Sequence, residues 1–167
     1  MFDPLSPEIQ FMRMALRQAE IAAEKGEVPC GAVIVKDGNV IGKAHNQTET
    51  LNDPTAHAEI LAITQATQAV DNWRLIGTTM YVTKEPCPMC AGALVLARIE
   101  KVVWGMTDPI RGGATSKFQI LDTADLNHAV QIQSGVMENE CKAVMQEFFQ
   151  NLRKSSKARK KQQSETK

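Results

Sequence analysis

TTMYVTKEPCPMCAGALVLA, residues 78–97, is the stretch that decides the architecture of this 167-residue chain. Its start is rich in β-branched and apolar residues, which predicts a buried strand over Thr78–Thr83. The alanine- and leucine-rich part from about Pro88 to Ala97 predicts a helix with proline in its first turn. Cys87 and Cys90 therefore lie where the strand passes into the helix. A strand followed at once by a helix is typical of an α/β protein.

Similar patterns continue on both sides of this stretch. Ser6 and Gly26 are a start and a stop signal for a first helix, Asp37-Gly38 is a hairpin signal, and Asp53-Pro54 is expected to open a second helix. The further expected elements are strands over 28–35, 40–45, 101–105 and 129–133, and helices from 53 to 70 and from about 137 onward. We therefore expect an α/β fold with a mixed sheet of about five strands and helices on both faces.

The length predicts one domain, and the charges are unevenly distributed along it. The chain has 19 basic and 19 acidic residues, and residues 153–167 contain seven Lys or Arg against Glu165. That segment carries +6, so the other 12 basic and 18 acidic residues leave −6. We expect a domain over 1–152 and a basic, flexible tail over 153–167, which fits a polyanionic partner or a solvated helix end.

Neither a membrane-spanning apolar run nor a secretory signal is found in the sequence, which predicts a cytoplasmic protein without a membrane partner. In a reducing compartment the close pair Cys87 and Cys90 indicates metal or redox chemistry rather than a disulfide. Cys30, in an apolar stretch, and Cys141, in a helical pattern, are more simply interpreted as buried thiols.

His57, Cys87 and Cys90 together form a ligand set that suits zinc. Three protein ligands leave one tetrahedral position for water, as in catalytic zinc sites, and we expect one Zn²⁺ per chain. Zinc lowers the pKa of bound water to about 7. Glu59 is the expected proton shuttle, which would accept the proton of that water; its alternative role is a helix-capping acid.

The spacing of His57 and Glu59 restricts where the site can lie. Side chains two positions apart on a helix point about 200° away from each other, so both serve one site only beyond the N-terminal end of the helix. We expect Asp53-Pro54 to place them in a first turn. Pro86-Cys87 likewise places both cysteines in the opening turn of the next helix, where thiolates are favoured.

Each of these segments alone has another interpretation. A single histidine is most often a surface or core residue, and a Cys-x-x-Cys pair before a helix is also found in thioredoxin-type redox sites or in half of a structural zinc site. Their combination, H-x-E followed by P-C-x-x-C, is the signature of the zinc-dependent nucleobase deaminases. It is complete in this sequence, over residues 57–59 and 86–90.

Further short sequence segments indicate which group within this class the chain resembles. They are Glu27-Val28-Pro29, residues 53–59, 81–83 and 85–93, Leu126-Asn127-His128 and Phe148-Phe149. With them, residues 7–155 resemble the bacterial tRNA-specific adenosine deaminases of the cytidine deaminase-like superfamily. The resemblance implies a three-layer α/β/α sandwich, a homodimer, and conversion of adenosine to inosine at the wobble position of a tRNA anticodon stem-loop.

The resemblance also implies substrate contacts. The expected residues near the flipped base and its ribose are Asn46, Val28, Pro29, Ala58 and Pro86, and those near the flanking nucleotides and the stem-loop are Asp108, Phe148, Phe149 and Arg153. The sequence departs from the family at Lys84, where an apolar residue is common, and over residues 110–113, where the family has a lysine-containing loop.

Three other functions fit parts of the pattern. The nearest is a free nucleobase or nucleoside deaminase, for guanine or cytosine, on the same fold. An inactive RNA-binding module stabilised by zinc is a second, although the presence of Glu59 argues against it. A thiol oxidoreductase is a third, which bound zinc would exclude.

Overall fold

The computed structural model describes residues 6–123 and 125–165, with side chains as far as residue 158. The elements in chain order are α1 (Pro7–Glu24), β1 (Gly31–Lys36), β2 (Asn39–His45), α2 (Thr48–Leu51), α3 (Ala58–Val70), β3 (Thr78–Lys84), α4 (Pro88–Leu96), β4 (Lys101–Met106), β5 (Gln131–Gln133) and α5 (Glu138–Glu165).

The sheet contains all five of these strands, in the order β2-β1-β3-β4-β5. β1 is antiparallel to both of its neighbours, whereas β3, β4 and β5 are parallel to one another. The mixed five-stranded sheet is therefore confirmed. Because β3 and β4 are parallel, their carboxyl ends lie at the same edge of the sheet, and the segments that follow them meet there.

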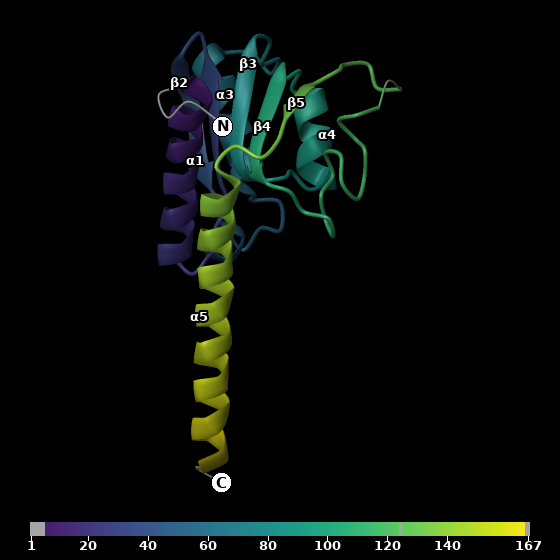
Figure 1. The fold of residues 1–167 in the computed structure, drawn as a ribbon. Coiled ribbons are helices and arrows are strands. Elements are labelled where there is room, and N and C mark those ends of the chain that lie inside the picture. The colour runs from purple at the N-terminus through teal and green to yellow at the C-terminus, as the bar shows by residue number, and fades with distance from the viewer. Residues whose placement is uncertain (1–5, 124, 166–167) are drawn as a thin grey trace.

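The helices form a layer on each face of the sheet, as Figure 1 shows. Successive residues of β1 point to opposite faces. Ile34 packs in the cluster that contains Ala62 of α3 and residues of α4, whereas Val33 packs in the cluster that contains Met12 of α1 and Cys141 of α5. The arrangement is the three-layer α/β/α sandwich, and Cys141 is a buried thiol as expected.

The hairpin between β1 and β2 forms at Asp37-Gly38, where both residues have positive φ, 49° and 75°. Positive φ at both central residues is what a two-residue type I′ turn requires. The expected start of the strand at Val28 is wrong, because β1 begins at Gly31. The amide of Cys30 bonds to the carbonyl of Val28 at 2.8 Å, so the chain turns tightly around Pro29 instead of extending.

The expected start of the second helix at Asp53-Pro54 is also wrong. α3 begins at Ala58, with His57 as its N-cap. The carboxylate of Asp53 instead accepts hydrogen bonds from the amide and hydroxyl of Thr55, at 2.8 and 2.7 Å, which closes a turn before the helix. The short helix α2 was not expected from the sequence, and β5 begins at Gln131 rather than at residue 129.

α5 runs past Leu152 as far as Glu165 and extends beyond the rest of the domain (Figure 1). Residues 151–158 of this helix are exposed. The division into a domain over 1–152 and a flexible tail stays a prediction. Within the described part of the chain, no helix combines the length and the apolar character needed to cross a membrane.

Candidate active site

Two helix N-termini face each other beyond the carboxyl end of β3. His57 is the N-cap of α3, Cys87 is the N-cap of α4, and Cys90 follows in the first turn of α4. The His57 side chain makes no capping hydrogen bond to α3. The three side chains instead approach one another in the space between the helices.

The donor atoms of these residues lie at distances that suit a metal ion. Nδ1 of His57 lies 3.6 Å from Sγ of Cys87 and 3.5 Å from Sγ of Cys90, and all three atoms lie within 4.8 Å of one another. Tetrahedral zinc, with bonds of about 2.3 Å to sulfur and about 2.0–2.1 Å to nitrogen, separates a sulfur and a nitrogen ligand by about 3.6 Å. His57, Cys87 and Cys90 therefore fit a zinc ion in both chemistry and spacing.

The protonation states of the two cysteines support this interpretation. Hydrogen bonds from Cys90 and then from His57 lower the pKa of Cys87 to about 4, despite its burial. The hydrogen bond that the Cys90 thiol makes with Cys87 raises the pKa of Cys90, burial raises it further, and repulsion by the Cys87 thiolate acts in the same direction. A divalent cation removes that repulsion and favours both thiolates, which is the state that zinc binds.

Glu59 lies one residue beyond the start of α3, in the same cavity as His57 and Cys87. Its side chain is 4% exposed, and burial is the main cause of the raised pKa of Glu59. A carboxyl group whose pKa lies closer to neutrality can both accept and return a proton, as general acid–base catalysis requires. The structure thus brings together the four residues for which the sequence predicted chemistry.

The cavity at this site has a volume of about 190 Å³. Residues from five stretches of the chain line it: Val28, Cys30, Asn46, Thr48, His57, Glu59, Lys84, Glu85, Cys87 and Arg111. Cys30 was interpreted from the sequence as a core thiol, but it is only half-buried and belongs to this lining. Thr48, Lys84, Glu85 and Arg111 were not predicted to be pocket residues.

Glu27, which is fully buried, holds the wall of the cavity that contains Asn46. Its carboxylate accepts hydrogen bonds from the Asn46 amide at 3.2 Å and from the amide and hydroxyl of Thr50 at 2.7 and 2.8 Å. The Thr48 hydroxyl and the Glu49 amide donate to it at 3.4 and 3.3 Å. Burial alone would raise the pKa of Glu27, but these hydrogen bonds hold it below its ordinary value.

Glu85 likewise holds a second wall of the cavity by accepting hydrogen bonds from the loop that follows β4. It is 2% exposed and accepts hydrogen bonds from the amides of Asp108, Thr115 and Ser116, at 2.9, 3.0 and 3.0 Å. The Ser116 hydroxyl donates to it at 2.5 Å. Burial opposes ionisation of Glu85 as well, and the hydrogen bonds from Ser116, Thr115 and Asp108 lower its pKa. Neither buried glutamate was assigned a role from the sequence.

The other predicted substrate contacts are distributed more widely. Asn46, 5% exposed, and Val28, 39% exposed, line the cavity. Pro29, Ala58 and Pro86 are buried, and each is adjacent in sequence to a residue that lines the cavity. Asp108 is buried and forms an ion pair with Lys84. Phe149 and Arg153 lie on α5, which contributes no residue to the cavity lining in the described part of the chain.

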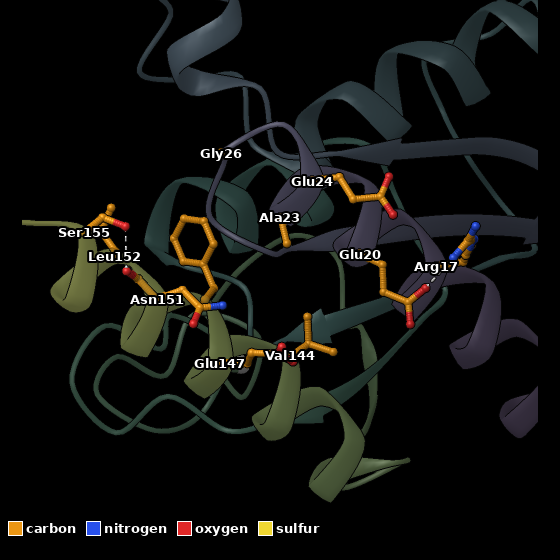
Figure 2. A pocket seen from close by; sticks show the side chains of 11 residues that line it. Arg17, Glu20, Ala23, Glu24, Gly26, Val144, Glu147, Asn151, Leu152 and Ser155 are labelled. Carbon is orange, nitrogen blue, oxygen red and sulfur yellow. Dashed lines mark hydrogen bonds and ion pairs between the residues drawn. The ribbon is translucent and has the colours of Figure 1, made fainter.

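A second and larger cavity, of about 650 Å³, lies between α1 and α5 (Figure 2). Phe148 lines it, together with Glu20, Glu24 and Glu147. Glu20 forms an ion pair with Arg17 at 2.8 Å. Its lining residues include no histidine or cysteine, and its glutamates would repel an RNA backbone. The smaller cavity beside β3 is therefore the candidate active site.

Comparisons with known proteins agree with this site. The sequence model of the MafB19-like deaminase family matches residues 7–153. The tRNA-specific adenosine deaminase of Bacillus subtilis strain 168 is 49% identical over 155 residues, which are 93% of this chain and 96% of that protein. The tRNA-specific adenosine deaminase of Aquifex aeolicus strain VF5 is 52% identical over 143 residues, or 86% and 94% of the two chains.

A solved structure of a deaminase is also similar to this chain in both fold and sequence. It comes from biochemical and structural studies of A-to-I editing by tRNA:A34 deaminases at the wobble position of transfer RNA. It has a TM-score of 0.78 and 44% identity, and the match covers 81% of this chain and 98% of that chain. The cytidine deaminase-like fold expected from the sequence is confirmed.

The fold and the His57, Cys87 and Cys90 cluster define a deaminase, and the chain belongs to the MafB19-like deaminase family. Within this family, its curated relatives are tRNA-specific adenosine deaminases that match almost end to end.

The buried carboxylate of Glu27 yields a prediction about stability. Glu27→Gln keeps the shape of the side chain but replaces an acceptor oxygen by a donor that faces other donors, so we expect a loss of about 1–3 kcal/mol in the free energy of unfolding at pH 7. Because the folded pKa of Glu27 is lowered, its contribution is complete above the unfolded value near 4.5 and is lost as the pH falls through the folded value. The difference between wild type and variant should therefore shrink below about pH 4.5.

Urea denaturation of both proteins between pH 3 and 8 measures this difference. Glu24→Gln, at an exposed position near the end of α1, is the matched control and should be neutral within about 0.5 kcal/mol. Equal stability of the Glu27→Gln and Glu24→Gln proteins at pH 7 would contradict the prediction.

Proposed function

We propose that this protein hydrolytically deaminates adenosine to inosine at the wobble position of tRNA anticodons. The observation that carries the proposal is the presence of His57, Cys87, Cys90 and Glu59 around one small cavity of a tRNA-deaminase-like fold. The choice of substrate is supported by the match to the Bacillus subtilis tRNA-specific adenosine deaminase, of which this chain covers 96%.

His57, Cys87 and Cys90 would hold one Zn²⁺ per chain. When bound there, zinc supplies a Lewis acid that makes a water molecule acidic enough to act as a nucleophile near pH 7. The N-terminal end of α4 would stabilise the two thiolates, and His57 and Cys87 line the same cavity as Glu59, so a water on the metal would lie within reach of that carboxylate.

Glu59 would carry the protons. Its carboxylate accepts a proton from the attacking water and passes it to the ring nitrogen N1 of adenine, while the oxygen bonds to C6. It then transfers the second proton of the water to the amine, and the C6–N6 bond breaks to release ammonia. Water and adenosine are thereby converted to inosine and ammonia without a redox step. The buried position of Glu59 beside His57 supports this role.

The remaining polar and apolar residues would hold the RNA. Asn46 and Val28 line the cavity and would contact the flipped nucleotide, with Pro29, Ala58 and Pro86 forming the wall behind them. Asp108 would lie beside the neighbouring nucleotides, and Phe149 and Arg153 on the exposed part of α5 would contact the stem-loop. The excess of basic residues after position 152 supports an anionic partner for this helix.

We further infer that the protein acts as a homodimer in the cytoplasm. The homodimer is inferred from the resemblance of this chain to the tRNA-specific adenosine deaminases. A tRNA substrate is consistent with the cytoplasm.

Zinc content tests the metal assignment. Wild-type protein purified without chelator should contain about one zinc per chain, and Cys87→Ser should contain less than about a tenth of that, because loss of one thiolate leaves two ligands. Cys30→Ser is the control, since this cysteine lies in the same cavity but outside the three-donor cluster, and it should retain the metal. Elemental analysis that finds equal zinc in both variants would refute the assignment.

Glu59→Gln tests the proton shuttle. The amide has the size of the carboxylate but cannot accept the proton, so we expect kcat to fall by at least about 10²–10⁴-fold with zinc content and fold unchanged. Glu100→Gln, at an exposed position next to β4, should keep wild-type kcat. If Glu59→Gln retained a tenth of wild-type kcat with full zinc occupancy, another group would have to transfer the protons.

The substrate is tested by comparing kcat/KM for an anticodon stem-loop with adenine at the wobble position, free adenosine, cytosine and guanine. We expect the stem-loop to be preferred by orders of magnitude, because flanking nucleotides provide binding energy that orients the reacting base. Inosine formation is measured by chromatography of the digested RNA. A preference for guanine or cytosine would instead indicate the free-base deaminase on the same fold and would leave the metal assignment intact.

A further inference from the structure

The segment 108–116 forms one wall of the candidate active site, and it contains no helix or strand. Arg111 of this segment lines the cavity together with Glu59 and Lys84. A loop of this kind keeps a fixed shape only if its backbone amides find partners. Glu85, which follows β3, accepts from three of these amides, and the Asp108 carboxylate, which is paired with Lys84 at the end of β3, accepts from two more.

Glu85 holds the loop through its backbone. Its two carboxylate oxygens accept from the amides of Asp108, Thr115 and Ser116, so both ends of the loop are attached to one buried side chain. Gly112 lies against the same carboxylate, and a Cβ at this position would overlap with it. The loop is therefore packed directly on Glu85 without an intervening side chain.

Lys84 holds the loop through the side chain of Asp108. Its ammonium group forms an ion pair with Oδ2 of Asp108, and both side chains are largely buried, at 25% and 11% exposure. The other oxygen of Asp108 accepts from the amides of Ile110 and Arg111, each at 3.0 Å. Lys84 therefore fixes the carboxylate that in turn fixes the backbone at Arg111.

The loop is also in contact with the metal-binding helix. The amide of Gly113 donates to the carbonyl of Pro86 at 2.7 Å, and a Cβ on Gly113 would meet backbone atoms of Cys87 and Pro88. The position of Arg111 is thus tied, through Lys84 and Glu85, to the strand end that leads into the site.

We propose that Lys84 and Glu85 are positioning residues that hold segment 108–116 as the substrate-facing wall and thereby set the affinity for RNA. The guanidinium of Arg111, whose donors suit a phosphate, is the group on this wall that RNA would contact. The inference rests on the proposed function for its substrate. Loosening of the loop should weaken RNA binding and leave the proton transfer at Glu59 unaffected.

Trypsin measures the loop directly, because it cleaves the Arg111–Gly112 bond only when the segment opens. In Glu85→Gln an amide donor faces the loop amides, so cleavage of the zinc-loaded, folded protein at this bond should be at least about tenfold faster than in wild type. Glu140→Gln, at an exposed position on α5, is the matched control and should match wild type. Unchanged cleavage in Glu85→Gln would overturn the proposal.

Kinetics with the wobble-adenine stem-loop give the second measurement. Glu85→Gln should raise KM by about tenfold or more while kcat stays within about twofold, since a misplaced contact can cost up to about 10²-fold. A parallel fall of kcat and zinc content would instead mean that Glu85 only supports the fold, and would overturn the positioning role. If wild type does not deaminate the stem-loop at all, the proposed function fails, whereas the trypsin result still decides whether the two residues hold the loop.

A double-mutant cycle tests the role of Lys84. Lys84→Met should accelerate cleavage of the Arg111–Gly112 bond and raise KM. Lys84→Arg, which retains the positive charge, should give a cleavage rate and a KM close to those of wild type. In the Asp108→Asn background Lys84→Met should have little further effect, because the two residues act through one ion pair. Lys43→Met, at an exposed position on β2, is the control. Additive effects of Lys84→Met and Asp108→Asn would overturn the assigned route through Asp108.

Discussion

The convergence of two helix N-termini at the end of β3 is the constraint on which the rest of the site depends. His57 and Cys87 are 30 residues apart, yet their donor atoms lie 3.6 Å from each other because each residue is the N-cap of a helix on the same face of the sheet. Side chains in a first helical turn point toward the N-terminal end, so both helices direct their ligands into one space. The dipoles of the helices stabilise the thiolates there.

A site built from loops and helix ends needs its backbone amides satisfied, and two buried carboxylates do this. Glu27 attaches the segment 46–50 to one wall, and Glu85 attaches 108–116 to the other. Neither has a neutralising lysine or arginine among the hydrogen-bond partners described; backbone amides, hydroxyls and one side-chain amide balance the charge instead. These hydrogen bonds fix the backbone of both walls around the cavity.

The sequence predicted the parts of the structure that local patterns determine. The hairpin at Asp37-Gly38, the strand expected over Thr78–Thr83 and the helix that starts after Cys87 each follow from residues within a few positions of one another. The H-x-E and P-C-x-x-C motifs likewise predicted the cluster of His57 and Cys87, because each motif lies at the start of a helix and side chains there point into one shared space.

The parts that were missed depend on distant partners. Glu27 and Glu85 bond to residues 19–31 positions away, and an acid next to a glycine or a proline gives no sign of such partners. Asp53 was expected to start α3, but its carboxylate is used by Thr55 in a preceding turn. Substrate contacts on α5 could be inferred only by resemblance, since Phe149 and Arg153 carry no pattern that distinguishes binding from solvent exposure.

Zinc K-edge X-ray absorption on the purified protein tests the central claim most directly. The account predicts four ligands, two sulfur atoms at about 2.3 Å and two nitrogen or oxygen atoms at about 2.0–2.2 Å, contributed by Cys87, Cys90, His57 and one water. Glu59→Gln should leave this spectrum unchanged, because Glu59 is not a ligand. A shell of four sulfur atoms, or one without sulfur, would contradict the account.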